Sequence, residues 1–142
     1  METKSPFQAL YTGRLWSVMS WDQLTAFWGR LDPAAGWYLY AIGEAVPTAP
    51  GTAEQVKNFI ERVDHLLRDD HRHDYCSIVY ADDLERPSFI KIYDPNNLGV
   101  SCGFSDNPPL PGWIMCQVVP EDLEADRPPP ESRRRWWKAL FS

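Results

Sequence analysis

Apolar residues recur along residues 53–68 with the spacing of one face of a helix. The residues of this stripe are Val56, Phe59, Ile60, Val63, Leu66 and Leu67. Thr52 precedes the stripe and Gln55 follows three residues later, which is the pattern of a capping box at a helix start. The chain is therefore expected to form an amphipathic helix here, with its apolar side against a flat apolar surface.

A second helix is predicted over residues 21–31. Ser20 and Gln23 repeat the capping pattern, and Pro33 ends the helix because proline disrupts a continuing helix. The shared apolar face consists of Trp21, Leu24, Trp28 and Leu31. Residues 10–19, which come before it, fit a strand and a helix equally well.

Four runs of β-branched and aromatic residues predict strands. They lie at residues 37–43, 75–81, 89–93 and 113–119. The first run is apolar on both faces, so we expect it to be a central strand. The polar connector 82–87 favours an antiparallel hairpin between the second and third runs, whereas the helix between the first two leaves room for a parallel pair.

These elements predict an α+β fold in the order α-β-α-β-β-β. The expected architecture is a two-layer sandwich, in which a four-stranded, mostly antiparallel sheet carries its helices on one face. A chain of 142 residues is long enough to bury a core without disulfides. Its seven Trp, six Tyr and six Phe supply large rings for that core or for a contact surface.

Charge divides the chain into two parts. Residues 1–126 carry nine basic and nineteen acidic side chains, a net charge of −10, whereas residues 127–142 carry five basic and one acidic, a net charge of +4. We expect a single acidic domain over 1–126 and, behind the proline run 128–130, a basic-aromatic tail over 127–142. The acidic body argues against nucleic acid as a partner, because phosphate binding needs clustered Lys and Arg.

Cysteine usage and hydropathy indicate a compartment. Three cysteines without a CxxC pair are not a disulfide framework and suit a reducing environment. No stretch approaches the roughly 20 apolar residues that span a bilayer, and the first residues show no secretory signal. These features predict a cytoplasmic protein.

One cluster suggests metal or redox handling. His71, His73 and Cys76 lie close together, imidazole and thiolate suit Zn or Cu, and alternate residues of an extended segment can face one ion. Cys102, in a loop, would add a second thiol and would be a nucleophile if a histidine lay beside it. The alternative is a solvated turn with incidental histidines and a buried, inert thiol.

The connection over residues 94–112 is a candidate binding loop. It is long for a compact domain and rich in turn residues, which favours a defined shape over a floppy one. We expect Asn96 and Asn97, together with Trp113 just after the loop, to contact a partner.

The tail is the other candidate. Its proposed binding residues are Arg133, Arg134, Arg135, Trp136 and Trp137, in a short amphipathic helix. Because Trp and Arg dominate interface energetics, a protein partner is expected, and the same composition suits weak contact with an anionic membrane. Alternatively, the tail folds back and seals an apolar edge of its own acidic body.

No complete catalytic motif is present, so the chain is expected to be neither an enzyme nor a cofactor binder. The leading hypothesis is a small cytoplasmic accessory or protein-interaction module that binds through the 94–112 loop, the tail or both. Metal or redox handling by the His–Cys cluster is the alternative hypothesis.

Overall fold

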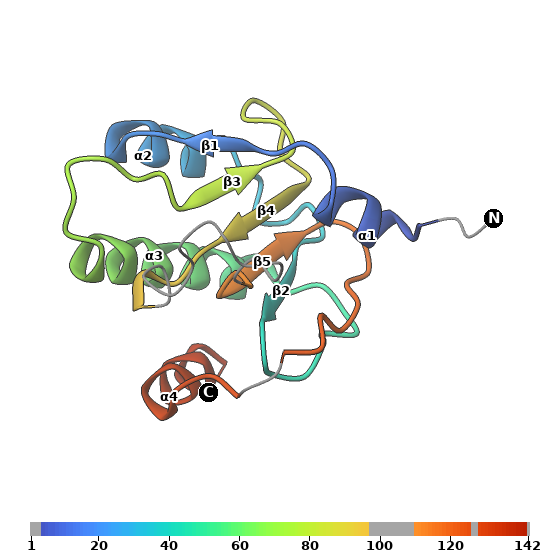
Figure 1. Cartoon of the computed structure of the whole chain (residues 1–142). Helices are drawn as coiled ribbons and strands as arrows, with labels where there is room; N and C mark the ends of the chain where they lie inside the picture. Colours follow the sequence, from blue (N-terminus) through green and yellow to red (C-terminus); the bar gives the residue numbers. More distant parts are fainter. Residues whose placement is uncertain (1–3, 97–109, 126–127, 142) are drawn as a thin grey trace, which may run out of the picture.

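A five-stranded sheet runs through the centre of the computed structural model, which describes residues 4–96, 110–125 and 128–141 (Figure 1). The strands are β1 (Trp16–Val18), β2 (Tyr38–Ala41), β3 (Val79–Ala81), β4 (Phe89–Ile92) and β5 (Trp113–Cys116). The helices are α1 (Pro6–Tyr11), α2 (Trp21–Gly29), α3 (Ala53–Asp70) and α4 (Glu131–Leu140). The predicted α+β class is therefore confirmed.

The sheet differs from the prediction in strand number and order. Its order is β1-β3-β4-β5-β2, and each of these neighbours is antiparallel. The fifth strand, β1, lies in the segment 10–19 that the sequence left open. The parallel pair for which the crossover helix left room does not form between β2 and β3, because these strands are not neighbours. The expectation of a central β2 was also wrong, since β2 is an edge strand.

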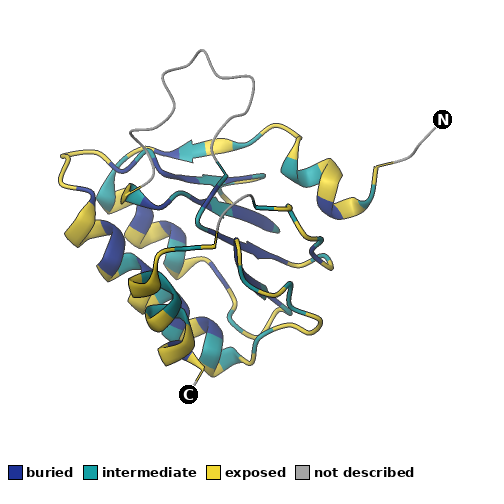
Figure 2. Ribbon diagram, turned by 60° about the horizontal axis from the view of Figure 1, so that its bottom comes forward, coloured by how far each residue is buried: buried dark blue, intermediate teal, exposed yellow. Residues whose placement is uncertain are grey.

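Both faces of the sheet are covered, which explains why β2 is apolar on both sides at an edge. Its Leu39 and Ala41 belong to the main core with α2, α3 and α4, whereas Tyr40 belongs to a second core on the opposite face. Phe7 of α1 packs in that second core against Phe89. The prediction that the helices pack on only one face of the sheet was therefore wrong, because α1 covers the other face. Figure 2 shows the strands as mostly buried and the outer helix surfaces as exposed.

The helix starts were predicted correctly from local chemistry. Ser20 with Gln23 and Thr52 with Gln55 both form complete capping boxes, in which side chain and backbone bond in both directions. Strand ends were predicted less well. The run 75–81 becomes a strand only from Val79, because Ser77 has a φ of 54°, which is incompatible with extended backbone.

Candidate functional site

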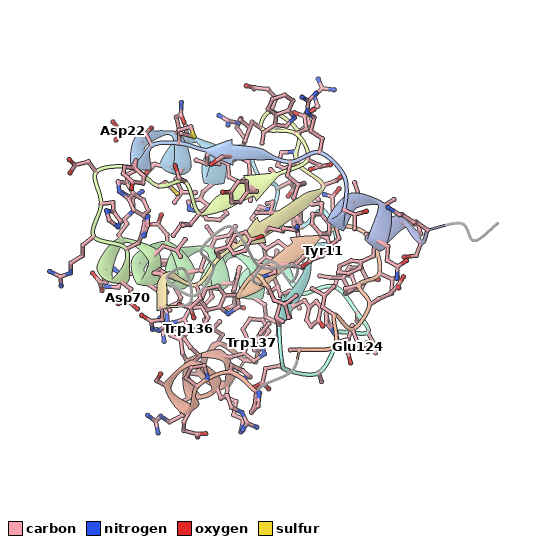
Figure 3. The ribbon with its side chains drawn as sticks, in the orientation of Figure 1. Tyr11, Asp22, Asp70, Glu124, Trp136 and Trp137 are labelled. Carbon is pink, nitrogen blue, oxygen red and sulfur yellow. The ribbon has the colours of Figure 1, made fainter. Side chains whose placement is uncertain are left out.

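Helix α4, which is most of the predicted tail, lies against α3 and the end of the sheet. Leu140 is buried in the main core. Trp136 packs its ring against Phe59 and Trp113, with centroid separations of 6.3 and 5.2 Å. Trp137 also contacts Phe59, at 6.0 Å. Figure 3 shows both tryptophans directed from α4 toward the body of the molecule. The rings are thus half-buried parts of the core rather than a free surface.

Ion pairs fix the same helix. Arg133 donates from Nε to Asp94 Oδ2 at 2.8 Å and from Nη2 to Asp94 Oδ1 at 3.1 Å, a bidentate arrangement. It also donates from Nη2 to Asp70 Oδ2 at 2.7 Å. The hydrogen bonds to Asp94 are the main cause of a raised pKa of Arg133. Arg134 makes a more exposed pair with Glu44. The acidic body therefore neutralises two of the tail's cations.

The proline run that leads into α4 also has a fixed contact. Gly43 has a φ of +94°, and a Cβ at this position would lie 2.6 Å from Cδ of Pro129. A side chain here would be both conformationally strained and in collision with the proline. The absence of a side chain at Gly43 therefore allows the chain to approach closely before α4 begins.

The structure places all the predicted binding residues except Asn97. Trp113 is buried in the core rather than at the surface, and Arg135 is exposed on α4. Asn96 is exposed, and its backbone N–H donates to Asp94 Oδ1 at 3.0 Å. Asn97 and Cys102 lie outside the described residues. In the structure the tail is folded back onto the acidic body, as the second interpretation of the tail had it.

Docking of α4 beside α3 creates a groove of about 650 Å³. It is lined by Glu61, Arg62, Asp64, His65, Leu66, Asp69, Asp70, Arg133 and Trp136. Seven of these residues come from α3 and two from α4, so the groove exists only because the tail is docked. Four carboxylates face two guanidinium groups, which makes the groove acidic.

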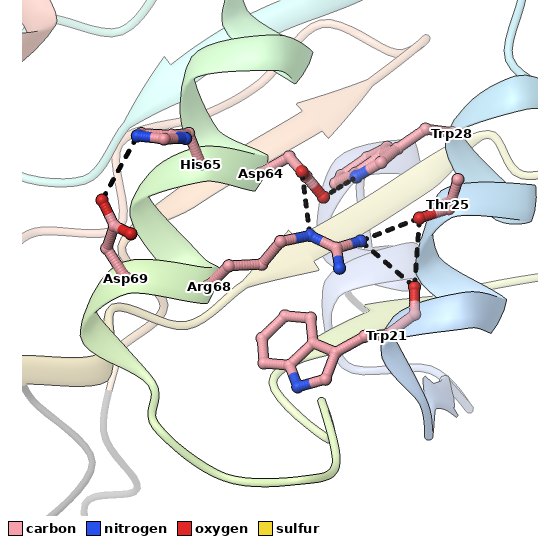
Figure 4. Close-up of polar contacts among 7 residues, drawn as sticks. All are labelled: Trp21, Thr25, Trp28, Asp64, His65, Arg68 and Asp69. Carbon is pink, nitrogen blue, oxygen red and sulfur yellow. Dashed lines mark hydrogen bonds and ion pairs between the residues drawn. The ribbon is translucent and has the colours of Figure 1, made fainter.

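The carboxylates of the groove differ in whether they already bind another side chain of the protein. Asp64 accepts from Trp28 Nε1 at 3.1 Å, which ties α3 to α2, and from Arg68 Nε at 3.0 Å within α3 (Figure 4). Asp70 is paired with Arg133. Asp69 is 3.3 Å from His65, but these side chains are 64% and 82% exposed. Glu61 has no ion pair with another described residue. Glu61 and Asp69 are therefore the charges available to a ligand.

The rings of the histidine cluster contact one another and Tyr75. His71 is buried and its Nε2 lies 2.9 Å from the carbonyl oxygen of Cys76, not from the thiol. Burial lowers the pKa of His71. The His73 ring lies 4.6 Å from that of His71 and stacks on Tyr75 at 5.2 Å. Within the described ranges, no group of three or more His, Cys, Asp or Glu is arranged to hold a metal ion.

Both cysteines among the described residues are expected to be unreactive in the folded protein. Burial raises the pKa of Cys76, and raises that of Cys116 to about 12. At pH 8 the thiolate population of Cys116 should be about a thousandfold below that of an ordinary cysteine. Native iodoacetamide labelling, followed by peptide mass spectrometry, should leave both unmodified, whereas labelling in urea should modify both. Equal rates in the two conditions would contradict the packing described here.

Among the described residues, no helix combines the length and apolar composition needed to cross a bilayer. No protein-family model, curated protein or solved structure matches this chain.

Sequence reasoning missed the groove as a site. The polar side of the 53–68 helix was visible as a pattern, but polar residues on one side of an amphipathic helix usually face only solvent. Their assembly into a groove depends on α4 lying beside them. The one usable signal was the charge contrast between the acidic body and the basic tail, which favours contact between the two.

Proposed function

We propose that this protein is a non-enzymatic accessory module that binds a basic segment of a partner protein in the α3–α4 groove. The observation that carries the proposal is a groove with available carboxylates at its rim and an indole and a leucine in its wall. The tail then contributes to binding as one wall of the site.

Charge supports a cationic ligand. The whole chain has a net charge of −6, so its field attracts positively charged segments. Arg133, the tail cation that lines the groove, is neutralised by Asp70 and Asp94. Glu61 and Asp69 are left to pair with Lys or Arg of a ligand.

The apolar lining suits the same ligand. Lys and Arg side chains bury their methylene stems on apolar surface while their charged ends stay near water or a carboxylate. The half-buried Trp136 offers the exposed part of its indole as such a surface, beside the mostly buried Leu66, and an indole also attracts a cation. A volume of about 650 Å³ is typical of a pocket that receives a few side chains rather than a whole domain.

Reversing the available charges should weaken this binding. We expect Glu61→Lys with Asp69→Lys to reduce affinity for a fluorescein-labelled Arg/Lys heptapeptide by about tenfold or more, since each exposed contact contributes up to about 1 kcal/mol. Fluorescence anisotropy at two salt concentrations would measure the affinity, and circular dichroism would check the fold.

A matched control separates the groove from the general charge of the protein. Glu85→Lys with Glu124→Lys makes the same change in net charge at exposed positions outside the groove (Figure 3 marks Glu124). This control should change the affinity by less than about threefold. An equal loss in both double variants would show non-specific attraction and would reject the groove as the binding site.

A further inference from the structure

A row of polar side chains crosses the sheet on the face opposite α3. Residues directly opposite each other in neighbouring strands share one face. The register pairs Ser17 with Tyr80, Tyr80 with Lys91, Lys91 with Ile114, and Ile114 with Tyr40. Ile114 and Tyr40 belong to the core that α1 covers, which places the whole row on that face. A lysine therefore stands in the middle of the sheet.

Lys91 has no carboxylate as an ion-pair partner among the described residues. The lysine is half-buried, and Nζ lies 3.9 Å from the centroid of the Tyr11 ring, at the end of α1. No ion pair joins it to any acid in the described part of the chain. Burial is the cause of a lowered pKa of Lys91. Removing a charge from water without a partner is unfavourable, and a cation–π contact offsets only part of that cost.

Three further hydroxyl groups belong to residues near this row: Ser17 lies in the row, the Tyr11 ring lies under the ammonium, and the Tyr93 ring contacts Tyr80 at 5.6 Å. Ser17 Oγ is buried and has no hydrogen-bond partner among the described residues. The hydroxyls of Tyr11 and Tyr93 form no hydrogen bond with another described residue. By contrast, Tyr80 donates to the carbonyl oxygen of Ser77 at 3.2 Å. Burial raises the pKa of Tyr93 and raises that of Tyr11 to about 12, so both phenols are protonated donors at neutral pH.

We propose that Lys91, with the hydroxyls of Tyr11 and Tyr93, binds a small oxyanion, the carboxylate or phosphate group of a ligand, on this face of the sheet. An ammonium and two neutral O–H donors match the charge and the acceptor oxygens of such a group. Ser17 lies two strands away in the same row, and its Oγ is buried, so it is not part of the proposed site. The bound anion would supply the counter-charge that the described residues do not provide at Lys91.

This site is separate from the proposed peptide groove. Tyr11 belongs to α1 and the second core, whereas the groove is formed by α3 and α4. Figure 3 shows Tyr11 apart from Trp136 and Trp137. The two proposals can therefore fail independently, because a variant of Lys91 should not change affinity for a basic peptide.

The lysines of the chain provide an internal control for the test. There are four, and the other three, Lys4, Lys57 and Lys138, are exposed. We would record the Cε resonances of ¹³C-labelled lysine while titrating inorganic phosphate, and acetate in a parallel series. A saturable shift of Lys91, half complete at about 1 mM or below, with small linear shifts of the other three, would support the site. The anion that shifts Lys91 at lower concentration identifies the preferred group.

Two variants test the assignment. Lys91→Met keeps an unbranched stem without charge and should weaken anion binding by about tenfold or more, as followed by a shift in thermal midpoint with phosphate. Tyr11→Phe keeps the ring over Lys91 but removes the hydroxyl, and should weaken binding about threefold. A Lys91 resonance that moves only in parallel with the three exposed lysines, or a Lys91→Met protein that binds phosphate as tightly as wild type, would overturn the proposal.

Discussion

Removal of residues 128–142 is expected to lower the free energy of unfolding by about 5 kcal/mol. Loss of Leu140 exposes apolar core surface worth about 2 kcal/mol. Loss of Arg133 leaves buried Asp94 without its counter-charge, which costs about 3 kcal/mol or more. Small domains are stable by about 5–15 kcal/mol, so the truncation should remove about a third or more of the total stability.

The truncation is measured by urea denaturation followed by far-ultraviolet circular dichroism. Tryptophan fluorescence is unsuitable, because the deletion removes two of the seven tryptophans. A synthetic peptide of residues 128–142 should restore stability when added in excess, since it binds only the folded form. A peptide of the same composition in scrambled order should not. An unchanged urea midpoint in the truncated chain would instead mean that the tail is a dispensable extension.

Local signals explain what the sequence predicted well. A capping box involves four consecutive residues, and the apolar stripe of α3 repeats every turn, so both can be recognised without knowing the rest of the fold. Thr52 with Gln55 and the stripe from Val56 to Leu67 accordingly appear as predicted. The β3–β4 hairpin is also local, because a short polar connector joins two neighbouring strands.

Non-local contacts explain what the sequence did not predict. The three-residue strand β1 is too short to show an alternating pattern, and it forms because β3 offers it an edge. Strand β2 lies beside β5, which is distant in sequence, so its position at the edge could not be derived from its own residues.

The candidate site is non-local in the same sense. Arg133 meets Asp94 across 39 residues and Asp70 across 63. The sequence showed that opposite charges were available and left self-docking open, but it did not show which acids would pair with which cations. No sequence motif therefore predicted the groove that follows from this pairing. The charge contrast between the body and the tail indicated that the two attract each other, but it did not indicate where α4 would lie on the body.

A single substitution, Arg133→Met, should account for much of the stabilisation that α4 provides. We expect it to lower the free energy of unfolding by about 3 kcal/mol, because it leaves Asp94 charged, buried and unpaired. Side chains in this pair are 13% and 6% exposed. Arg134→Met is the matched control, with the same chemical change one residue along α4. Its pair with Glu44 is 41% and 18% exposed, so the expected cost is about 1 kcal/mol or less.

A double-mutant cycle identifies the cause of the loss. Asp94→Asn removes the buried charge but keeps a carbonyl oxygen that can accept from the backbone N–H of Asn96. If the cost of Arg133→Met comes from the stranded carboxylate, the same substitution should cost about 1–2 kcal/mol less in the Asp94→Asn background. Urea denaturation of the four proteins of this cycle, with Arg134→Met beside them, gives the coupling directly. Small and equal costs for Arg133→Met and Arg134→Met would show that apolar packing alone holds α4, and that the ion pair with Asp94 sets only its orientation.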